Sequence, residues 1–184
     1  ASWLARHLTG AYVLDHQSAS QVSPLYDVER EEWHADNWAR YAPGIEAPRL
    51  LWAGDIAGQV TDAAAAATGL PAGIPVIAGT IDAWSEAVSV GAHEFGDLML
   101  MYGTTMFLVA TGTETLRTPS MWTTVGAFPG TRNPAGGLST SGALTATQAK
   151  TVLAEMVASG EAPADIAAAK GFEAMGDHAL ESAI

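Results

Sequence analysis

The feature that most constrains the fold is a helix, a turn, a strand and a second helix in close succession. Thr61 is a suitable N-cap for the alanine-rich run 62–68, and Gly69 stands where such a helix would end. Residues 75–79 then predict a short apolar strand, of the kind that lies buried in a central sheet. A second helix follows at once and ends at Gly91. This order predicts an α/β layered domain.

The pattern changes after this unit. Apolar stretches separated by glycines predict two strands within 97–111 and further strands at 121–128 and 137–140. Residues 146–158 predict an alanine-rich helix. The chain has 184 residues, enough for one ordinary domain or two small ones. We place a candidate domain boundary near residues 91–97.

Composition and charge exclude several classes of function. The chain is 48% hydrophobic, enough for a sizeable core, and its formal net charge is -12. Its eight basic residues are scattered, which argues against a nucleic-acid partner, because phosphate contacts need clustered Lys and Arg. A single nucleotide stays compatible, since backbone N–H groups, hydroxyls and a metal ion can hold its phosphates. Without cysteine, the chain has no disulfide, thiol nucleophile or Cys-based zinc site.

Neither a metal site nor a membrane span is predicted. The five histidines are far apart and show no metal-ligand spacing. The most apolar stretch, 98–110, is too short to cross a membrane, and no signal peptide opens the chain. We therefore expect a soluble, cytoplasmic protein without protein ligands to a metal.

Asp82 is the first candidate for chemistry. It lies in Gly79-Thr80-Ile81-Asp82-Ala83, between the predicted strand and the helix that follows. Ligands of open α/β sheets collect at the carboxyl ends of strands, where a carboxylate can act as a general base toward an alcohol. The pattern is equally typical of a plain helix cap, so both interpretations stay open. Trp84, two residues later, is predicted either to face a sugar or to pack in the core.

Two glycine-containing turns are further candidates. Gly103, Thr104 and Thr105 lie between two apolar strands, and their N–H and O–H groups can donate to a phosphate. A plain hairpin turn explains them as well. The Gly- and Ser-rich run 136–142 lies near a nucleotide or is simply a connection.

Together these segments resemble the FGGY carbohydrate kinases, and among them the xylulokinase-type members. The likeness covers about residues 1–112 and rests on five stretches in the same order as in the family. They are the helix ending in Leu8-Thr9-Gly10, the segment from Asp15 to Trp33, the segment from Gly58 to Val76, the junction Gly79 to Ala83, and Gly96-Asp97-Leu98 with Gly103-Thr104-Thr105.

The resemblance implies an α/β, ribonuclease-H-like fold of the actin and hexokinase type, of which the chain carries parts of two domains. Residues 1–93 would be the C-terminal part of the first, sugar-binding domain. Residues 94–184 would be the start of the second, ATP-binding domain. Complete family members are longer than this chain, so we expect the 184-residue chain alone to be inactive.

The resemblance also implies an activity. The enzyme would be an ATP-dependent carbohydrate kinase with Mg²⁺, acting on a ketopentose such as xylulose. Asp82 would be the base, Gly103, Thr104 and Thr105 would hold phosphate oxygens, and Trp84 would contact the sugar. A kinase of ribulose, fuculose or glycerol stays an alternative, as does a non-catalytic sugar- or nucleotide-sensing protein on the same fold. We expect a small-molecule sugar as partner, no nucleic acid and no membrane, and leave a homodimer open.

Overall fold

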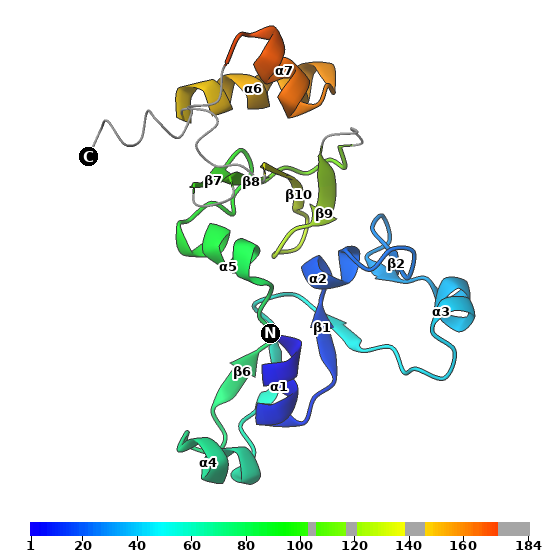
Figure 1. The fold of residues 1–184 in the computed structure, drawn as a ribbon. Helices are drawn as coiled ribbons and strands as arrows, with labels where there is room; N and C mark the ends of the chain where they lie inside the picture. The colour runs from blue at the N-terminus through cyan, green and yellow to red at the C-terminus, as the bar shows by residue number, and fades with distance from the viewer. Residues whose placement is uncertain (103–105, 117–120, 139–145, 173–184) are drawn as a thin grey trace. The chain divides into compact units, whose positions relative to one another are not determined.

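A computed structural model describes residues 1–102, 106–116, 121–138 and 146–172, which form mixed α/β structure (Figure 1). The chain divides into two compact units. Unit 1 comprises residues 1–97, 111–114 and 124–133, and unit 2 comprises the rest. A compact unit is a property of packing and need not coincide with a family domain, so the boundary expected after residue 93 stays a prediction.

Unit 1 is built from short helices and two-stranded sheets. Strands β1 and β4 pair in parallel, whereas β2 with β3 and β5 with β6 pair antiparallel. Its elements are α1 (Ser2–Thr9), β1 (Val13–Asp15), α2 (His16–Ser20), β2 (Tyr26–Asp27), β3 (Glu32–Trp33), α3 (Ala35–Tyr41), β4 (Arg49–Leu51), β5 (Ile56–Gln59), α4 (Asp62–Thr68), β6 (Pro75–Ile77) and α5 (Asp82–Ser89).

The predicted helix–strand–helix unit is present, but its strand is less buried than expected. Thr61 caps α4 and Gly69 ends it in the left-handed conformation, at φ 77°. Strand β6 pairs with β5 and with no other strand of the described residues, and Ile77 is 55% exposed. The expectation of a strand buried in a central sheet is therefore wrong for this structure, because one edge and much of the surface of β6 lack a covering element.

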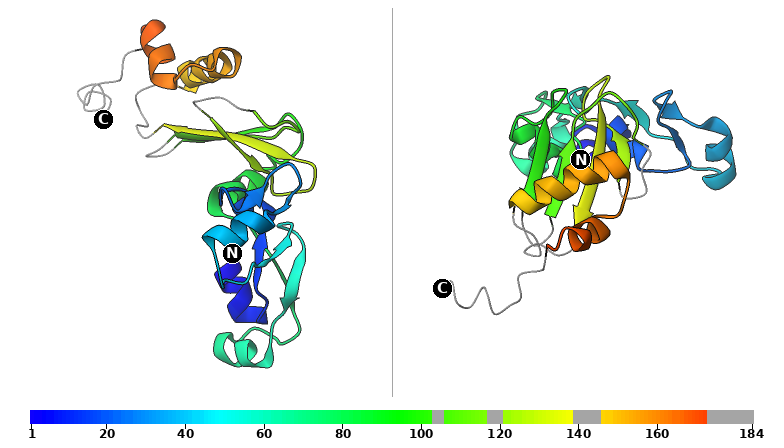
Figure 2. Two further views of the ribbon diagram at one scale, coloured as in Figure 1. Left: turned by 90° about the vertical axis from the view of Figure 1, so that its right-hand side faces the viewer. Right: turned by 90° about the horizontal axis from the view of Figure 1, so that it is seen from above.

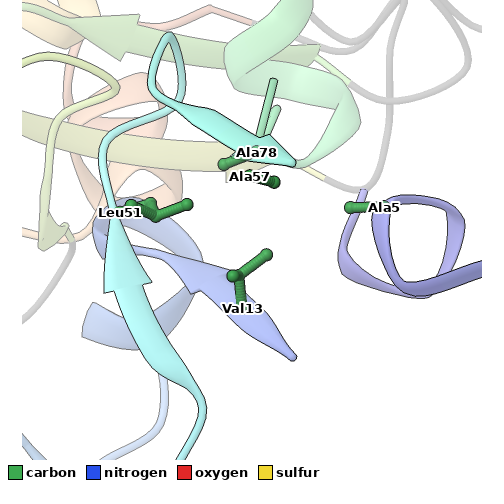
Figure 3. Close-up of a cluster of buried hydrophobic side chains, with 5 residues drawn as sticks. All are labelled: Ala5, Val13, Leu51, Ala57 and Ala78. Atoms are coloured by element: carbon green, nitrogen blue, oxygen red, sulfur yellow. The ribbon is translucent and has the colours of Figure 1, made fainter. Parts of the chain in front are cut away.

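Small residues let α1 pack closely on the strands of unit 1. Figure 3 shows the side chains that meet there, all at most 8% exposed: Ala5, Val13, Leu51, Ala57 and Ala78. A methyl group added to Gly58 of β5 would lie 2.8 Å from Cβ of Thr9, well inside van der Waals contact. The close approach of α1 beside β1 and β6 (Figure 1) thus depends on alanine and glycine at the interface.

The segment 124–133 is joined to the early part of unit 1. Val125 is fully buried with Ala19 and Tyr26. Arg132 forms an ion pair with Glu31 at 2.8 Å, and its side chain is only 11% exposed. These contacts link residues about a hundred positions apart in the sequence.

Unit 2 packs two helices on a sheet. The strands are β7 (Leu98–Tyr102), β8 (Met106–Ala110), β9 (Trp122–Val125) and β10 (Arg132–Leu138), in the order β7-β8-β10-β9, and residues of β9 and β10 also belong to unit 1. Helices α6 (Ala146–Ser159) and α7 (Pro163–Ala169) lie on one side of the sheet (Figure 2). Their contact buries Met121, Val152, Met156 and Ile166.

Two sequence predictions for the sheet have different outcomes. The two strands expected within 97–111 are confirmed as the antiparallel pair β7 and β8. The strand expected at 137–140 begins earlier, because β10 pairs with β8 from Ala135 to Leu138 and extends back to Arg132. Gly136 and Gly137, which suggested a loop, lie inside this strand. At Gly137 the Phe107 ring is 3.3 Å from where a Cβ would be, so a larger residue would not fit without a shift.

Candidate active site

Asp82 stands at the end of a turn whose backbone is held on the preceding strands. The N–H of Ala78 donates to the carbonyl of Asp55 at 2.9 Å, and the N–H of Gly79 donates to the carbonyl of Ala53 at 2.9 Å. Gly79 has φ +68°, a left-handed conformation that glycine adopts without strain. The chain can therefore turn sharply after β6 and begin α5 at Asp82.

The Asp82 carboxylate is exposed and makes little use of its hydrogen-bonding capacity. The N–H of Ala83 donates to Oδ1 of Asp82 at 2.8 Å, and no other described residue bonds this carboxylate. The N-cap of α5 is Ile81, so Asp82 is the first residue of the helix and not its cap. A carboxylate with free acceptor sites can receive a proton or a hydrogen bond from a bound alcohol.

A buried polar cluster lies behind the turn. The hydroxyl of Thr80 is 2.8 Å from Oδ1 of Asp15 and 3.1 Å from Oε1 of Gln17. Asp15 is 2% exposed and Gln17 is 1% exposed. Asp15 also caps α2, since its Oδ1 accepts the N–H of Ser18 at 3.0 Å. The cluster thus joins the turn before Asp82 to the start of α2.

Trp84 fixes the buried side of α5. It is 3% exposed, and its indole N–H donates to Oδ1 of Asn133 at 3.1 Å. The amide of Asn133 in turn donates to the hydroxyl of Thr111 at 3.1 Å. These residues border a cavity of about 10 Å³, room for one water molecule. The structure thus gives Trp84 a packing role, and its contact with a sugar stays a prediction.

His16 lies next to Asp15 in an aromatic group. Its ring stacks on Trp52 with 4.3 Å between centroids, and its Nδ1 is 2.7 Å from the hydroxyl oxygen of Tyr26. Burial lowers the pKa of His16 below its ordinary value, although nearby carboxylates oppose this shift; they belong to Glu31, Asp15 and Asp55. The neutral imidazole is therefore the form that this environment favours.

The predicted phosphate turn, Gly103, Thr104 and Thr105, lies outside the described residues. Residues 139–142 of the Gly- and Ser-rich run lie outside them as well. Within the described part of the chain, no group of three or more His, Asp or Glu side chains is arranged to hold a metal ion. In that same part, no helix has the length and apolarity that crossing a membrane would need.

Sequence reasoning missed the residues that hold Asp82 and Trp84 in place. In the sequence Asp15 stands out only as part of a motif, and no local pattern points to Thr111 or Asn133. A carboxylate at the end of a short apolar strand was the one signal for Asp15. Nothing local indicated that Asn133 bonds a tryptophan 49 residues away.

Comparison with known proteins relates the chain to sugar kinases. Residues 1–89 match the FGGY family of carbohydrate kinases, N-terminal domain. A ribulokinase from Mycolicibacterium smegmatis is 35% identical over 134 residues, which cover 66% of this chain and 22% of that protein.

Solved structures show the same relationship. A xylulose kinase from Rhodospirillum rubrum is similar with a TM-score of 0.68 and 26% identity, over 85% of this chain and 33% of that one. A xyloylose kinase from Brucella ovis is similar with a TM-score of 0.67 and 22% identity, over 89% of this chain and 33% of that one. The chain thus spans about a third of these structures, and less of the ribulokinase.

These likenesses confirm the α/β, ribonuclease-H-like fold of the actin and hexokinase type. They also agree with the five ordered motifs, four of which lie within residues 1–89. Residues 1–89 thus match the N-terminal domain of the FGGY family of carbohydrate kinases, and the similarity to a ribulokinase agrees with this match.

Proposed function

We propose that the protein containing this chain transfers the γ-phosphoryl group of ATP to a hydroxyl of a ketopentose, with Asp82 as general base. The observation that carries the proposal is the exposed Asp82 carboxylate, which opens α5 directly after the turn that follows β6. The match of residues 1–89 to a family of carbohydrate kinases supports this reaction class.

The geometry suits a base better than a structural carboxylate. Asp82 forms no ion pair with a described residue and bonds only the N–H of Ala83. A general base must come within about 2.6–3.2 Å of the proton-bearing oxygen, and an exposed side chain leaves room for that approach. Phosphoryl transfer needs mainly positioning and neutralisation of charge, so a base on a firmly held turn contributes by aligning the attacking hydroxyl.

The cofactors belong to the proposal as well. We assign ATP on family grounds, with Gly103, Thr104 and Thr105 holding phosphate oxygens. Mg²⁺ would neutralise phosphate charge when bound. The described residues offer no group of three or more His, Asp or Glu side chains for this ion.

Two ketopentoses are supported by the relatives. Xylulose is favoured by the similar solved xylulose kinase, and ribulose by the relative of higher identity, a ribulokinase. A non-catalytic sensor on the same fold would have no need of an exposed carboxylate at this turn.

A substrate panel tests the activity. The intact protein is incubated with ATP, Mg²⁺ and xylulose, ribulose, fuculose or glycerol, and ADP and phosphorylated product are quantified by mass spectrometry. We expect one ADP for each phosphorylated ketopentose and slower turnover of glycerol. Absence of acceptor-dependent ADP with all four compounds would contradict the proposal.

The phosphate turn has its own test. Thr104→Val removes a hydroxyl assigned to a phosphate oxygen, so the KM for ATP should rise or kcat should fall, while the KM for the sugar stays unchanged. Unaltered ATP kinetics in this variant would remove Thr104 from the site.

A further inference from the structure

The buried carboxylate of Asp15 has an unusual set of partners. The N–H of Ser18 at 3.0 Å and the hydroxyl of Thr80 at 2.8 Å both donate to the same oxygen, Oδ1. Asp15 is 2% exposed and forms no ion pair with a described residue. Burying a carboxylate is costly unless donors satisfy it, so the hydroxyl of Thr80 is strongly held in this orientation.

Gln17 supports the same orientation. A hydroxyl has one proton, so Thr80 cannot donate to Asp15 and Gln17 at once. A half turn of the Gln17 amide brings its nitrogen to 3.1 Å from Oγ1 of Thr80, where the hydroxyl accepts from Gln17 and donates to Asp15. The Gln17 nitrogen, which is buried and otherwise lacks a partner, is then satisfied.

The main chain of Thr80 is held as well. The hydroxyl of Ser85 donates to its carbonyl at 3.4 Å, and the preceding residue, Gly79, is bonded to Ala53. Asp82 lies two residues after Thr80. Because Ile81 offers no side-chain cap, Thr80 is the last side chain before Asp82 that anchors the turn.

We infer that Asp15 is a positioning residue for Asp82 and acts through the hydroxyl of Thr80, with Gln17 orienting that hydroxyl. This inference rests on the proposed function, since positioning matters only if Asp82 is the base. Asp15 does not touch the substrate in this account. It fixes the turn, and the turn fixes where the carboxylate of Asp82 meets the attacking hydroxyl.

Kinetics of the intact protein test the role of Thr80. Thr80→Val keeps the shape and removes the hydroxyl, so kcat should fall about ten- to a hundredfold while the sugar KM changes little. Thr80→Ser keeps the hydroxyl and should restore most of kcat. Thr68→Val is the matched control, because the Thr68 hydroxyl also makes two hydrogen bonds, to Ala64 and Leu70, but at the end of α4. A kcat for Thr80→Val equal to that of Thr68→Val overturns the inference.

The route through Asp15 needs a double variant. Asp15→Asn leaves a weaker, neutral acceptor and should lower kcat by itself. When Thr80→Val is already present, Asp15→Asn should lower kcat no further, because the contact through which it acts is gone. If the double variant instead loses kcat by the product of the two single-variant factors, Asp15 does not act through Thr80.

Hydrogen exchange of the intact protein gives a readout that needs no activity. The N–H of Ala83 is bonded by the Asp82 carboxylate, so its exchange reports where that carboxylate lies. It should speed up about tenfold or more in Thr80→Val, and not in Thr80→Ser or Thr68→Val. If the wild type phosphorylates no acceptor, the proposed function fails. The exchange rate of the Ala83 N–H then still tests whether the Thr80 hydroxyl anchors the turn before Asp82. Unchanged exchange in Thr80→Val overturns it.

Discussion

Helices α4 and α5 begin in similar ways, and the difference between them is instructive. Each follows a strand of the β5–β6 pair, and each has an exposed aspartate as its first residue, Asp62 in α4 and Asp82 in α5. The N-cap of α4 is Thr61, whose hydroxyl accepts the N–H of Ala64 at 3.2 Å. The N-cap of α5 is Ile81, which has no such bond.

A threonine is present before both helices, but it is used differently. Thr61 caps its own helix, a local interaction of about 1 kcal/mol. Thr80 stands one position too early to be the N-cap, and its hydroxyl bonds Asp15, 65 residues away. The start of α5 thus departs from the local rule and is held by a long-range contact. Departures of this kind are expected at functional sites, which is why similar sequences at the two helices have different meanings.

The largest expected difference between the two helices is in turnover. Asp82→Asn in the intact protein should lower kcat about a hundred- to ten-thousandfold, because it removes the general base. Asp62→Asn makes the same change at the same helix position of α4 and should leave kcat within about twofold, as expected of a surface position. Steady-state kinetics with a ketopentose measure both. An equal loss of kcat in Asp82→Asn and Asp62→Asn would contradict a special role for Asp82.

A substitution on the buried side of α5 should lower the free energy of unfolding more than the same substitution at an exposed position. Trp84→Phe removes the indole N–H that Asn133 accepts and leaves space in the core, so the free energy of unfolding should fall by about 1–3 kcal/mol. Trp3→Phe is the control, since Trp3 is 71% exposed, and it should cost no more than about 0.5 kcal/mol. Urea titrations compare them. A loss at Trp3 as large as at Trp84 would be inconsistent with this packing.

The start of α4 can be made to resemble that of α5. Thr61→Ile gives α4 the N-cap residue of α5 and removes the bond to Ala64, which should cost about 1 kcal/mol of stability. The kcat of the intact protein should not change. A fall in kcat at saturating substrates would mean that α4 also takes part in the reaction.

The smallest expected effect is on the pH dependence of stability, and it comes from His16, the neighbour of Asp15 in the sequence. Burial lowers the pKa of His16, so the unfolded chain binds its proton at higher pH than the folded protein does. Stability should therefore rise with pH in the window just below the ordinary histidine pKa of about 6.5, and be lost again as pH falls. His16→Gln should flatten this slope in urea titrations at several pH values. An identical slope in the wild type and the variant would contradict the assignment to His16.

Local signals were sufficient for some elements. Thr61 and Gly69 marked the ends of α4 correctly, because a cap and a left-handed glycine act within one turn of a helix. The position of Asp82 after a strand was equally visible. The ordered motifs predicted the fold, which the similar solved structures confirm.

Long-range contacts could not be predicted in the same way. The bonds Thr80–Asp15 and Trp84–Asn133 join residues 65 and 49 positions apart, and no spacing rule connects them. The sequence predicts β10 to begin too late, because Gly136 and Gly137 locally favour a loop, whereas in the structure they pair with β8 as part of the strand. Tertiary pairing overrode local propensity there.

A single-turnover experiment tests the role of Asp82 most directly. The intact protein and its Asp82→Asn variant are mixed with saturating ketopentose and ATP with Mg²⁺, sugar binding is followed by calorimetry, and sugar phosphate is followed by rapid quench. We expect the variant to bind the sugar with the wild-type Kd and to form product at least about a hundredfold more slowly. Product formation at the wild-type rate in Asp82→Asn would contradict the assignment of Asp82 as the base.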